Sequence, residues 1–90
     1  MIKPTVGRVV WFFPTESPMN APPLAAMIAY VHSDRLINVG ALDANGIAFA
    51  ATSVLLLQDD EPRDPGQDCA CWMPYQKSVA SGEIPVTLHV

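Results

Sequence analysis

The sequence predicts an all-β fold, a small barrel of about five antiparallel strands with an extra edge strand at the C-terminus. Two observations lead to it. Residues 25–58 are rich in Ile, Val, Leu and Tyr, side chains that fit a pleated surface. Short polar sequences that form tight turns divide this stretch into runs of strand length. We expect residues 25–58 to be a meander of four strands within a single domain.

The first predicted strand is residues 6–13, opened by Gly7 and ended by Pro14, which has no N–H to donate to a sheet. Alternation gives this strand two apolar faces, one with Val10 and Phe12 and the other with Val9, Trp11 and Phe13. Which face points inward stays open. Residues 14–23 hold four of the nine prolines, so we expect an extended irregular loop there.

Residues 27–32 and 35–42 are predicted to form a hairpin, because only Ser33 and Asp34 separate them. A two-residue loop fixes which side chains share a face of the hairpin. One face then holds Ile28, Tyr30, Ile37 and Val39, and the other holds Ala29, Val31, Leu36 and Asn38. We expect the first of these faces to lie in the core.

Asp43-Ala44-Asn45-Gly46 predicts a second hairpin with two possible turns. The turn is type I′ at Asn45-Gly46, or it is type I followed by a bulge, and the choice moves Phe49 from one face to the other. Thr52 and Ser53 then interrupt the pattern before residues 54–57. We predict a closing strand at residues 54–57, with a single helical turn as the alternative.

The order of strand, long loop, three-stranded meander, brief turn and closing strand is that of an SH3-like barrel, whose loops at one end usually frame a binding groove. We therefore assign residues 1–77 to one β-barrel domain. Residues 78–90 form a tail in which residues 84–90 alternate apolar and polar side chains, as an edge strand does. We expect this strand to follow a flexible hinge at residues 80–82 and to dock in trans on a neighbouring copy.

The composition is apolar for so small a protein, with 50% hydrophobic and 16% charged residues and a net charge of −4. A surplus of apolar side chains favours association, so we expect a homo-oligomer. The acidic balance and only five Lys and Arg argue against generic binding to DNA, RNA or anionic membranes. No signal peptide or membrane span is recognisable, which favours a cytoplasmic protein.

The sequence offers no pattern for catalysis or for metal binding. Residues 58–68 carry five acids, but they lack the ordered spacing of a calcium loop, so a solvated loop is expected. Cys69 and Cys71 are expected to be thiols, because one intervening residue is a poor spacing for a disulfide and a weak one for zinc. We therefore expect neither a metal, nor a cofactor, nor an enzyme.

Seven residues are candidates for ligand contacts: Arg8, Trp11, Tyr30, His32, Arg35, Trp72 and Tyr75. The aromatic rings of Trp11, Tyr30 or Trp72 can stack on a base, and Arg8 or Arg35 can bind phosphate. Trp72 and Tyr75 have two interpretations, since they either cap the open end of the barrel or form a recognition surface. His32 beside Arg35 is a solvated pair or an anion clamp.

Several segments together resemble a group of small uncharacterised proteins of tailed bacteriophages and prophages. The segments are KPTVGRVVWF, HSDR with NV, DANG, TSVLLLQ and WMPYQ, and the resemblance covers residues 2–77. This group carries no agreed activity, so no site residue is transferred. The resemblance implies a phage-encoded binding protein in the cytoplasm of the bacterial host.

We expect this binding protein to counter bacterial defence by sequestering a nucleotide-derived immune signal within an oligomer. One alternative is an inhibitor that binds a host protein, with the acidic residues 59–68 meeting a basic surface. Another is a minor virion or scaffold component.

Overall fold

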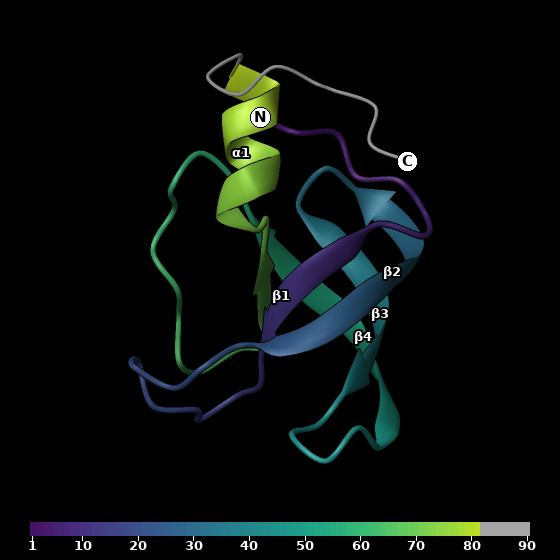
Figure 1. Ribbon diagram of the computed structural model, residues 1–90, viewed down its shortest axis with the longest axis vertical. Helices are drawn as coiled ribbons and strands as arrows, with labels where there is room; N and C mark the ends of the chain where they lie inside the picture. Colours follow the sequence, from purple (N-terminus) through teal and green to yellow (C-terminus); the bar gives the residue numbers. More distant parts are fainter. Residues whose placement is uncertain (82–90) are drawn as a thin grey trace.

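The computed structural model describes the backbone of residues 1–81 and the side chains of residues 1–77, and it is a closed barrel of five strands (Figure 1). The elements are β1 (Val9–Phe13), β2 (Leu24–Ser33), β3 (Leu36–Leu42), β4 (Ala48–Leu57), β5 (Cys69–Cys71) and α1 (Pro74–Ser81). The strands follow one another around the barrel in chain order, which confirms the predicted small all-β barrel. The predicted strand at residues 84–90 lies outside the described residues.

The meander at residues 25–58 has three strands rather than four, because β4 runs without a break from Ala48 to Leu57. The interruption predicted at Thr52 and Ser53 is a β-bulge within β4. Val39 pairs with Ala51 and Ile37 pairs with Val54, so two residues of β4 lie opposite Asn38. The strand predicted at residues 54–57 is the end of β4 and is not a separate closing strand.

The barrel is closed by β5, which pairs antiparallel with β1 and parallel with β4. Antiparallel pairing throughout the barrel was expected, and that prediction is wrong at the contact between β4 and β5. The cause is the segment of residues 58–68, which returns the chain to the level of Leu55 before β5 begins opposite it. The two strands therefore run in the same direction.

The core is formed by alternate residues of all five strands. Its buried members are Val10, Phe12, Ala26, Ile28, Ile37, Val39, Ala41, Ala51, Val54, Leu56, Ala70 and Trp72. The inward face of the first strand is therefore the one with Val10 and Phe12. Trp72 follows β5 and is 2% exposed, so it takes the capping role that was one of its two interpretations.

The hairpin of β2 and β3 turns at Asp34 and Arg35, one residue later than predicted, with Ser33 opposite Leu36. The register shifts between Ile28 and Tyr30, which is a bulge. Tyr30 is therefore 56% exposed, and its predicted place on the core face is wrong. Strict alternation misplaced it because one extra residue in a strand moves every following side chain to the other face.

Of the two turns predicted between β3 and β4, the structure has the type I turn followed by a bulge. The Gly46 N–H donates to the Asp43 carbonyl at 2.9 Å, and Gly46 has a φ of +81°, which a residue without Cβ adopts freely. The Asp43 carboxylate accepts the Asn45 and Ile47 N–H groups at 2.8 and 2.9 Å. Phe49 consequently lies opposite Ala41, on the inner side of the sheet.

The helix α1 was not predicted, and Ala80 and Ser81, assigned to a flexible hinge, are its last residues. Pro74 opens the helix, where its missing N–H costs no hydrogen bond. The Gln76 side chain accepts the Met73 N–H at 2.7 Å, in the manner of a capping box. Both signals, Pro74 and Gln76, lie in the first turn of the helix and can be read in the sequence.

The two long loops lie side by side (Figure 1), held together by Arg63. Its guanidinium donates to the carbonyls of Ser17 at 2.7 Å and Pro18 at 2.9 Å. Asp68 accepts the Thr15 N–H and hydroxyl at 2.7 and 2.8 Å. The acidic segment at residues 58–68 is therefore docked on the loop at residues 14–23 through its polar side chains.

Candidate functional site

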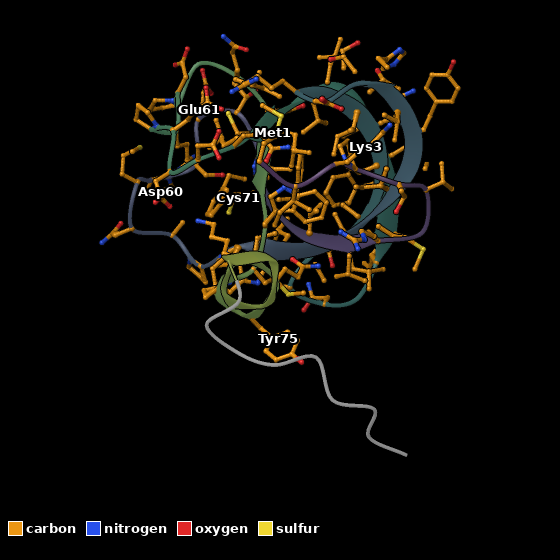
Figure 2. All side chains as sticks on the ribbon, turned by 90° about the horizontal axis from the view of Figure 1, so that it is seen from above. Met1, Lys3, Asp60, Glu61, Cys71 and Tyr75 are labelled. Carbon is orange, nitrogen blue, oxygen red and sulfur yellow. The ribbon has the colours of Figure 1, made fainter. Side chains whose placement is uncertain are left out.

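The structure does not gather the seven predicted ligand contacts into one pocket. Arg8 and Trp72 lie together at one end of the barrel, Tyr30 and His32 lie on the outside of β2, and Arg35 is on the turn after it. Tyr75 is 58% exposed on α1 and points away from the barrel (Figure 2). Trp11 is half-buried on the outer side of β1.

Trp72 is a structural residue in this arrangement. Its indole N–H donates to the Gln58 side-chain oxygen at 3.1 Å, and the Arg8 guanidinium lies 5.6 Å from the ring centroid. The core takes up most of the remaining surface of the ring, which is 2% exposed. Trp72 thus has no open face on which a base can stack.

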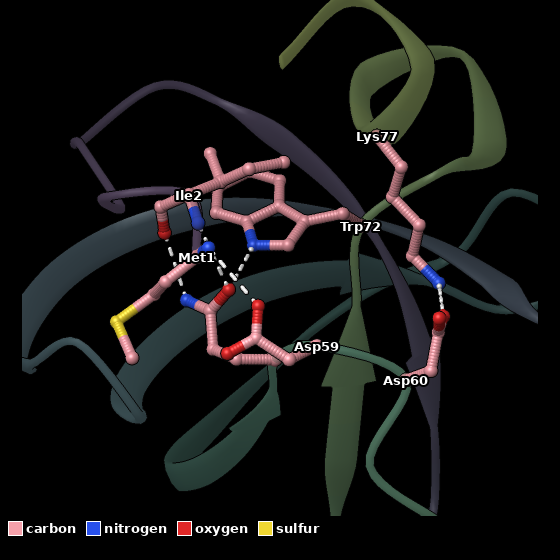
Figure 3. Close-up of a pocket in the computed structure, with 7 residues that line it drawn as sticks. Met1, Ile2, Asp59, Asp60, Trp72 and Lys77 are labelled. Atoms are coloured by element: carbon pink, nitrogen blue, oxygen red, sulfur yellow. Dashed lines mark hydrogen bonds and ion pairs between the residues drawn. The ribbon is translucent and has the colours of Figure 1, made fainter. Parts of the chain in front are cut away.

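Gln58 joins the N-terminal segment to the end of the barrel, a role that sequence reasoning missed. The dashed lines that end at Ile2 and at the Trp72 ring in Figure 3 mark its contacts. Its side-chain oxygen also accepts the Ile2 N–H at 3.1 Å. Its amide nitrogen donates to the carbonyls of Ile2 at 2.8 Å and Asp34 at 3.0 Å. With Trp72, these contacts use both donors and both acceptor positions of a side chain that is 1% exposed.

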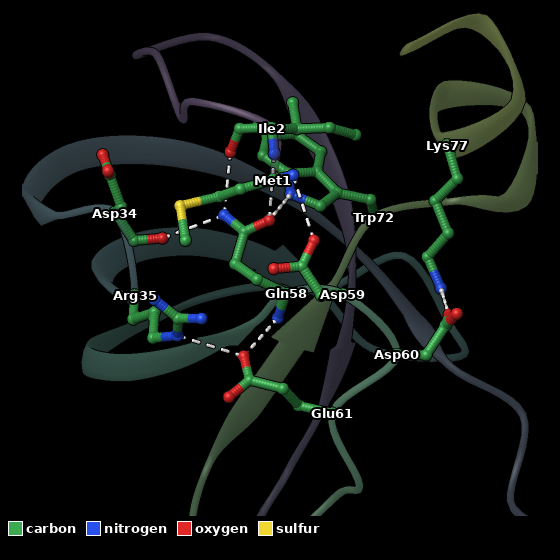
Figure 4. Close-up of polar contacts among 10 residues, drawn as sticks. All are labelled: Met1, Ile2, Asp34, Arg35, Gln58, Asp59, Asp60, Glu61, Trp72 and Lys77. Carbon is green, nitrogen blue, oxygen red and sulfur yellow. Dashed lines mark hydrogen bonds and ion pairs between the residues drawn. The ribbon is translucent and has the colours of Figure 1, made fainter. Parts of the chain in front are cut away.

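A pocket of about 280 Å³ lies beside Gln58. It is lined by Met1, Ile2, Gln58, Asp59, Asp60, Trp72 and Lys77. The charged groups are paired: the Met1 ammonium with Asp59 at 3.0 Å and Lys77 with Asp60 at 3.1 Å (Figure 4). Both ion pairs are solvent-exposed contacts within the chain, so the pocket lining offers a ligand no unpaired charge.

Arg35 is also engaged. Its Nε donates to the Glu61 carboxylate at 3.1 Å, and the same carboxylate oxygen accepts the Gln58 backbone N–H at 2.7 Å (Figure 4). The Gln58 N–H, and then Arg35, lower the pKa of Glu61 from its ordinary value of 4.5. The predicted phosphate contact is therefore an ion pair that fixes the turn against the loop after β4.

Tyr30 and His32 are brought together by the bulges of β2, with ring centroids 4.8 Å apart. The Asn38 side-chain oxygen accepts the Ser53 N–H at 2.9 Å and lies 3.0 Å from His32 Nε2. Because that oxygen is an acceptor, His32 Nε2 must carry the hydrogen. Tyr30 and His32 are exposed, and Asn38 is half-buried beneath them.

A second pocket, of about 300 Å³, contains the Cys71 thiol. Burial raises the pKa of Cys71, so this thiol is a weak nucleophile at neutral pH. The Arg63 Nε is buried without a hydrogen-bond partner, while the other guanidinium nitrogens hold the two loops together. Among the described residues no group of three or more His, Cys, Asp or Glu is arranged to hold a metal ion.

The outside of the barrel carries an apolar surface, which we call the outer apolar face. Directly opposed residues of β1, β2, β3 and β4 form two rows across the sheet. The rows are Val9–Met27–Gly40–Ala50 and Trp11–Ala25–Leu42–Ala48. The rows contain no charged side chain, and Met27 is 52% and Leu42 43% exposed.

A groove of about 380 Å³ runs over this face. Its lining is Val9, Ala25, Ala26, Met27, Gly40, Ala41, Leu42 and Ala48. A Cβ added to Gly40 would meet nothing within 4 Å, so the fold itself does not require a glycine here. Glycine inside a strand weakens it and often marks the close approach of another backbone or a ligand.

Of the seven predicted contacts, only Trp11 belongs to the outer apolar face. Two signals in the sequence point to the other residues of this face. Residues 9–13 and 24–28 have apolar side chains at both odd and even positions, and Gly40 lies inside a strand. Assigning them to one surface required the register of four strands, which the sequence does not state.

No protein-family model matches the chain, and no curated protein or solved structure matches it. Among the described residues, no helix combines the length and the apolar character needed to cross a membrane.

Proposed function

We propose that this protein is a non-enzymatic binding protein that contacts another protein through the outer apolar face. The observation that carries the proposal is the pair of uncharged rows across four strands. The solvent face of an antiparallel sheet is usually polar, and a contiguous apolar patch on a soluble domain commonly marks an interaction site.

The chemistry of the face defines its partner. A groove walled by Val9, Met27 and Leu42 and floored by small residues suits aliphatic side chains on an extended or flat segment. The chain around it has a net charge of −4, which favours approach to a basic surface. The resemblance to phage accessory proteins suggests a stoichiometric inhibitor of a host protein, or a scaffold component, in the bacterial cytoplasm.

Sequestration of a nucleotide, which the aromatic and basic residues of the sequence led us to expect, is the second candidate. A nucleotide site needs an open aromatic face beside an unpaired cation. Trp72 is buried, and Arg35 is paired with Glu61. Calorimetry against cyclic dinucleotides and ADP-ribose derivatives tests this candidate. No heat is expected, and saturable binding of any of them would reverse the ranking.

Gly40→Asp tests the proposed function, with Ala44→Asp as its matched control. The Asp side chain at position 40 has room in the free protein, but a partner would bury its charge, which costs several kcal/mol. Ala44 lies in the exposed turn between β3 and β4 and is not part of the face.

The measurement is capture of host proteins from a bacterial lysate by the three tagged proteins, followed by the affinity of any purified partner. Wild type and Ala44→Asp are expected to bind the same partner, with Gly40→Asp weaker by about 100-fold or more. A partner held equally by all three proteins, or no partner for wild type, would contradict the proposal.

A further inference from the structure

β4 has a paired strand on both sides at Leu55, where the pairing with β3 ends and the pairing with β5 begins. β5 pairs with Leu55, Leu56 and Leu57, whereas residues 48–54 pair with β3 alone among the described residues. This stretch, Ala-Phe-Ala-Ala-Thr-Ser-Val, has no proline and no charge. Most of it is exposed, and such an edge is a template for another strand.

The backbone hydrogen bonds show which groups are open. The Asp43 N–H donates to the Ile47 carbonyl at 3.0 Å, so residues 43 and 47 bond to each other. Antiparallel pairs alternate between bonded and non-bonded, which turns the N–H and carbonyl groups of Ala48 and Ala50 away from β3. Neither residue takes part in the backbone hydrogen bonds that the described residues make outside the sheet.

We propose that this edge of β4 receives residues 84–90 of a second copy of the chain as an added strand. The two segments have the same length of seven residues. Ile84, Val86, Leu88 and Val90 alternate with Pro85, Thr87 and His89. Alternation of this type suits a strand with one buried and one solvated face, and Pro85 is compatible with the outer edge of a sheet.

The side chains at the edge give the added strand an apolar surface to cover. Phe49 lies on the inner side of β4, 6.0 Å from the Phe12 ring, yet it is 38% exposed. The apolar residues of the tail would lie beside Phe49 and extend the core at that end of the barrel. Thr87 and His89 would then face water.

The distance from the end of α1 to the open edge of β4 indicates that the added strand comes from a second copy and not from the same chain. α1 rises from the end of the barrel opposite the β3–β4 hairpin (Figure 1), and its eight residues carry the chain about 12 Å. Val54 lies three residues before the end of β4 at Leu57, about 10 Å along the strand, so the return from Ser81 takes roughly 20 Å, or about six extended residues. Only Gly82 and Glu83 lie between α1 and residue 84, so a chain cannot lay residues 84–90 along its own edge.

Ala48 and Ala50 lie both on this edge and in the outer apolar face, so the two proposals are separated by Leu88→Asp, which changes only the tail, and by Gly40→Asp, which changes only that face. Three variants of the full chain test the contact between the edge and the tail. Leu88→Asp places a charge on the apolar side of the tail, and Thr87→Asp places the same charge on the side expected to face water. Ala50→Pro removes an N–H from the open edge without removing a bond to β3.

The measurement is solution mass by light scattering at about 50 μM, with circular dichroism to verify folding. Wild type and Thr87→Asp are expected to be dimers or larger, and Leu88→Asp and Ala50→Pro to have the 9.7 kDa mass of one chain. An equimolar mixture of Leu88→Asp and Ala50→Pro should recover a species of two chains, because one partner keeps its edge and the other its tail.

A monomeric wild type would overturn the proposal, and so would Leu88→Asp with the mass of wild type. A mixture that stays monomeric would show that tail and edge do not meet between copies. If Ala50→Pro does not fold, the comparison of Leu88→Asp with Thr87→Asp still decides, since equal masses for the two contradict the proposed contact. Gly40→Asp should keep the mass of wild type.

Discussion

The end of the barrel around Gln58 and the outer apolar face differ in what they leave unsatisfied. At the barrel end the four hydrogen-bonding positions of the Gln58 side chain are used, and the charges around the adjoining pocket are paired. On the outer apolar face Met27 and Leu42 remain about half exposed. Satisfied polar groups hold a fold together, whereas unburied apolar surface is available for binding.

The comparison also separates two kinds of pocket. The pocket beside Gln58 exists because the N-terminal segment closes the barrel imperfectly, and its lining is occupied with contacts inside the chain. The groove over Gly40 has no such internal explanation, because a side chain would fit at that position without touching the rest of the protein. A ligand is therefore sought at the groove and not in the pocket.

The largest effect is expected from Gln58→Ala. The substitution leaves a cavity and removes the partners of the Trp72 N–H and of the backbone groups of Ile2 and Asp34. The expected fall in the free energy of unfolding is about 3–5 kcal/mol. Urea unfolding measures it, with Gln67→Ala in the exposed loop as control, and a loss below about 1 kcal/mol would contradict the assigned role.

Trp72→Phe is expected to have a smaller effect. It keeps most of the buried ring but removes the N–H that donates to Gln58, whose oxygen still accepts from Ile2. A loss of about 1–2 kcal/mol is expected in the same urea experiment. If instead Trp72→Phe binds a nucleotide less tightly at unchanged stability, the residue contacts a ligand.

Gly40→Leu should leave the free energy of unfolding within about 1 kcal/mol of wild type, because a strand gains from a larger side chain and the space is open. It fills the groove, so binding of a partner should be lost. Thermal unfolding and partner affinity, measured on the same sample, give the two results. Stability lost together with binding would mean that Gly40 serves the fold.

Glu61→Gln is expected to have the smallest effect, visible only in acid. The pKa of Glu61 is lowered in the folded protein, so its contribution to stability is present above its ordinary pKa of 4.5 and is lost as the pH falls through the lower, folded value. The variant should therefore show a flatter fall in stability below pH 4.5 than wild type. Parallel curves for the two proteins between pH 5 and pH 3 would show that Glu61 is not coupled to folding.

Most of the barrel follows from the sequence, because β-branched and aromatic runs and the turn at Asp43 to Gly46 are local signals. The bulge at Ala29 is not local, since it depends on how β2 meets β3, and it placed Tyr30 on the wrong face. The closing strand was also missed. β5 has only three residues, and its pairing is decided by where the preceding loop returns the chain.

The candidate site was harder to predict than the fold. Gln58 contacts Ile2 across 56 positions in the chain, and no pattern in the sequence connects them. The outer apolar face depends on the register of β1 to β4, which brings Met27 and Leu42 onto one surface with Val9 and Trp11. Aromatic and basic residues drew attention because they resemble ligand contacts, and the structure uses Trp72 and Arg35 to hold the fold.

The most direct test of the contrast between the two regions is titration of the native protein with a dye that fluoresces on binding apolar surface, such as anilinonaphthalene sulfonate. Wild type and Ala44→Asp are expected to bind the dye saturably while fully folded, and Gly40→Asp to bind it at least about tenfold more weakly. Equal binding by the three folded proteins, or none by wild type, would contradict an open apolar groove over Gly40.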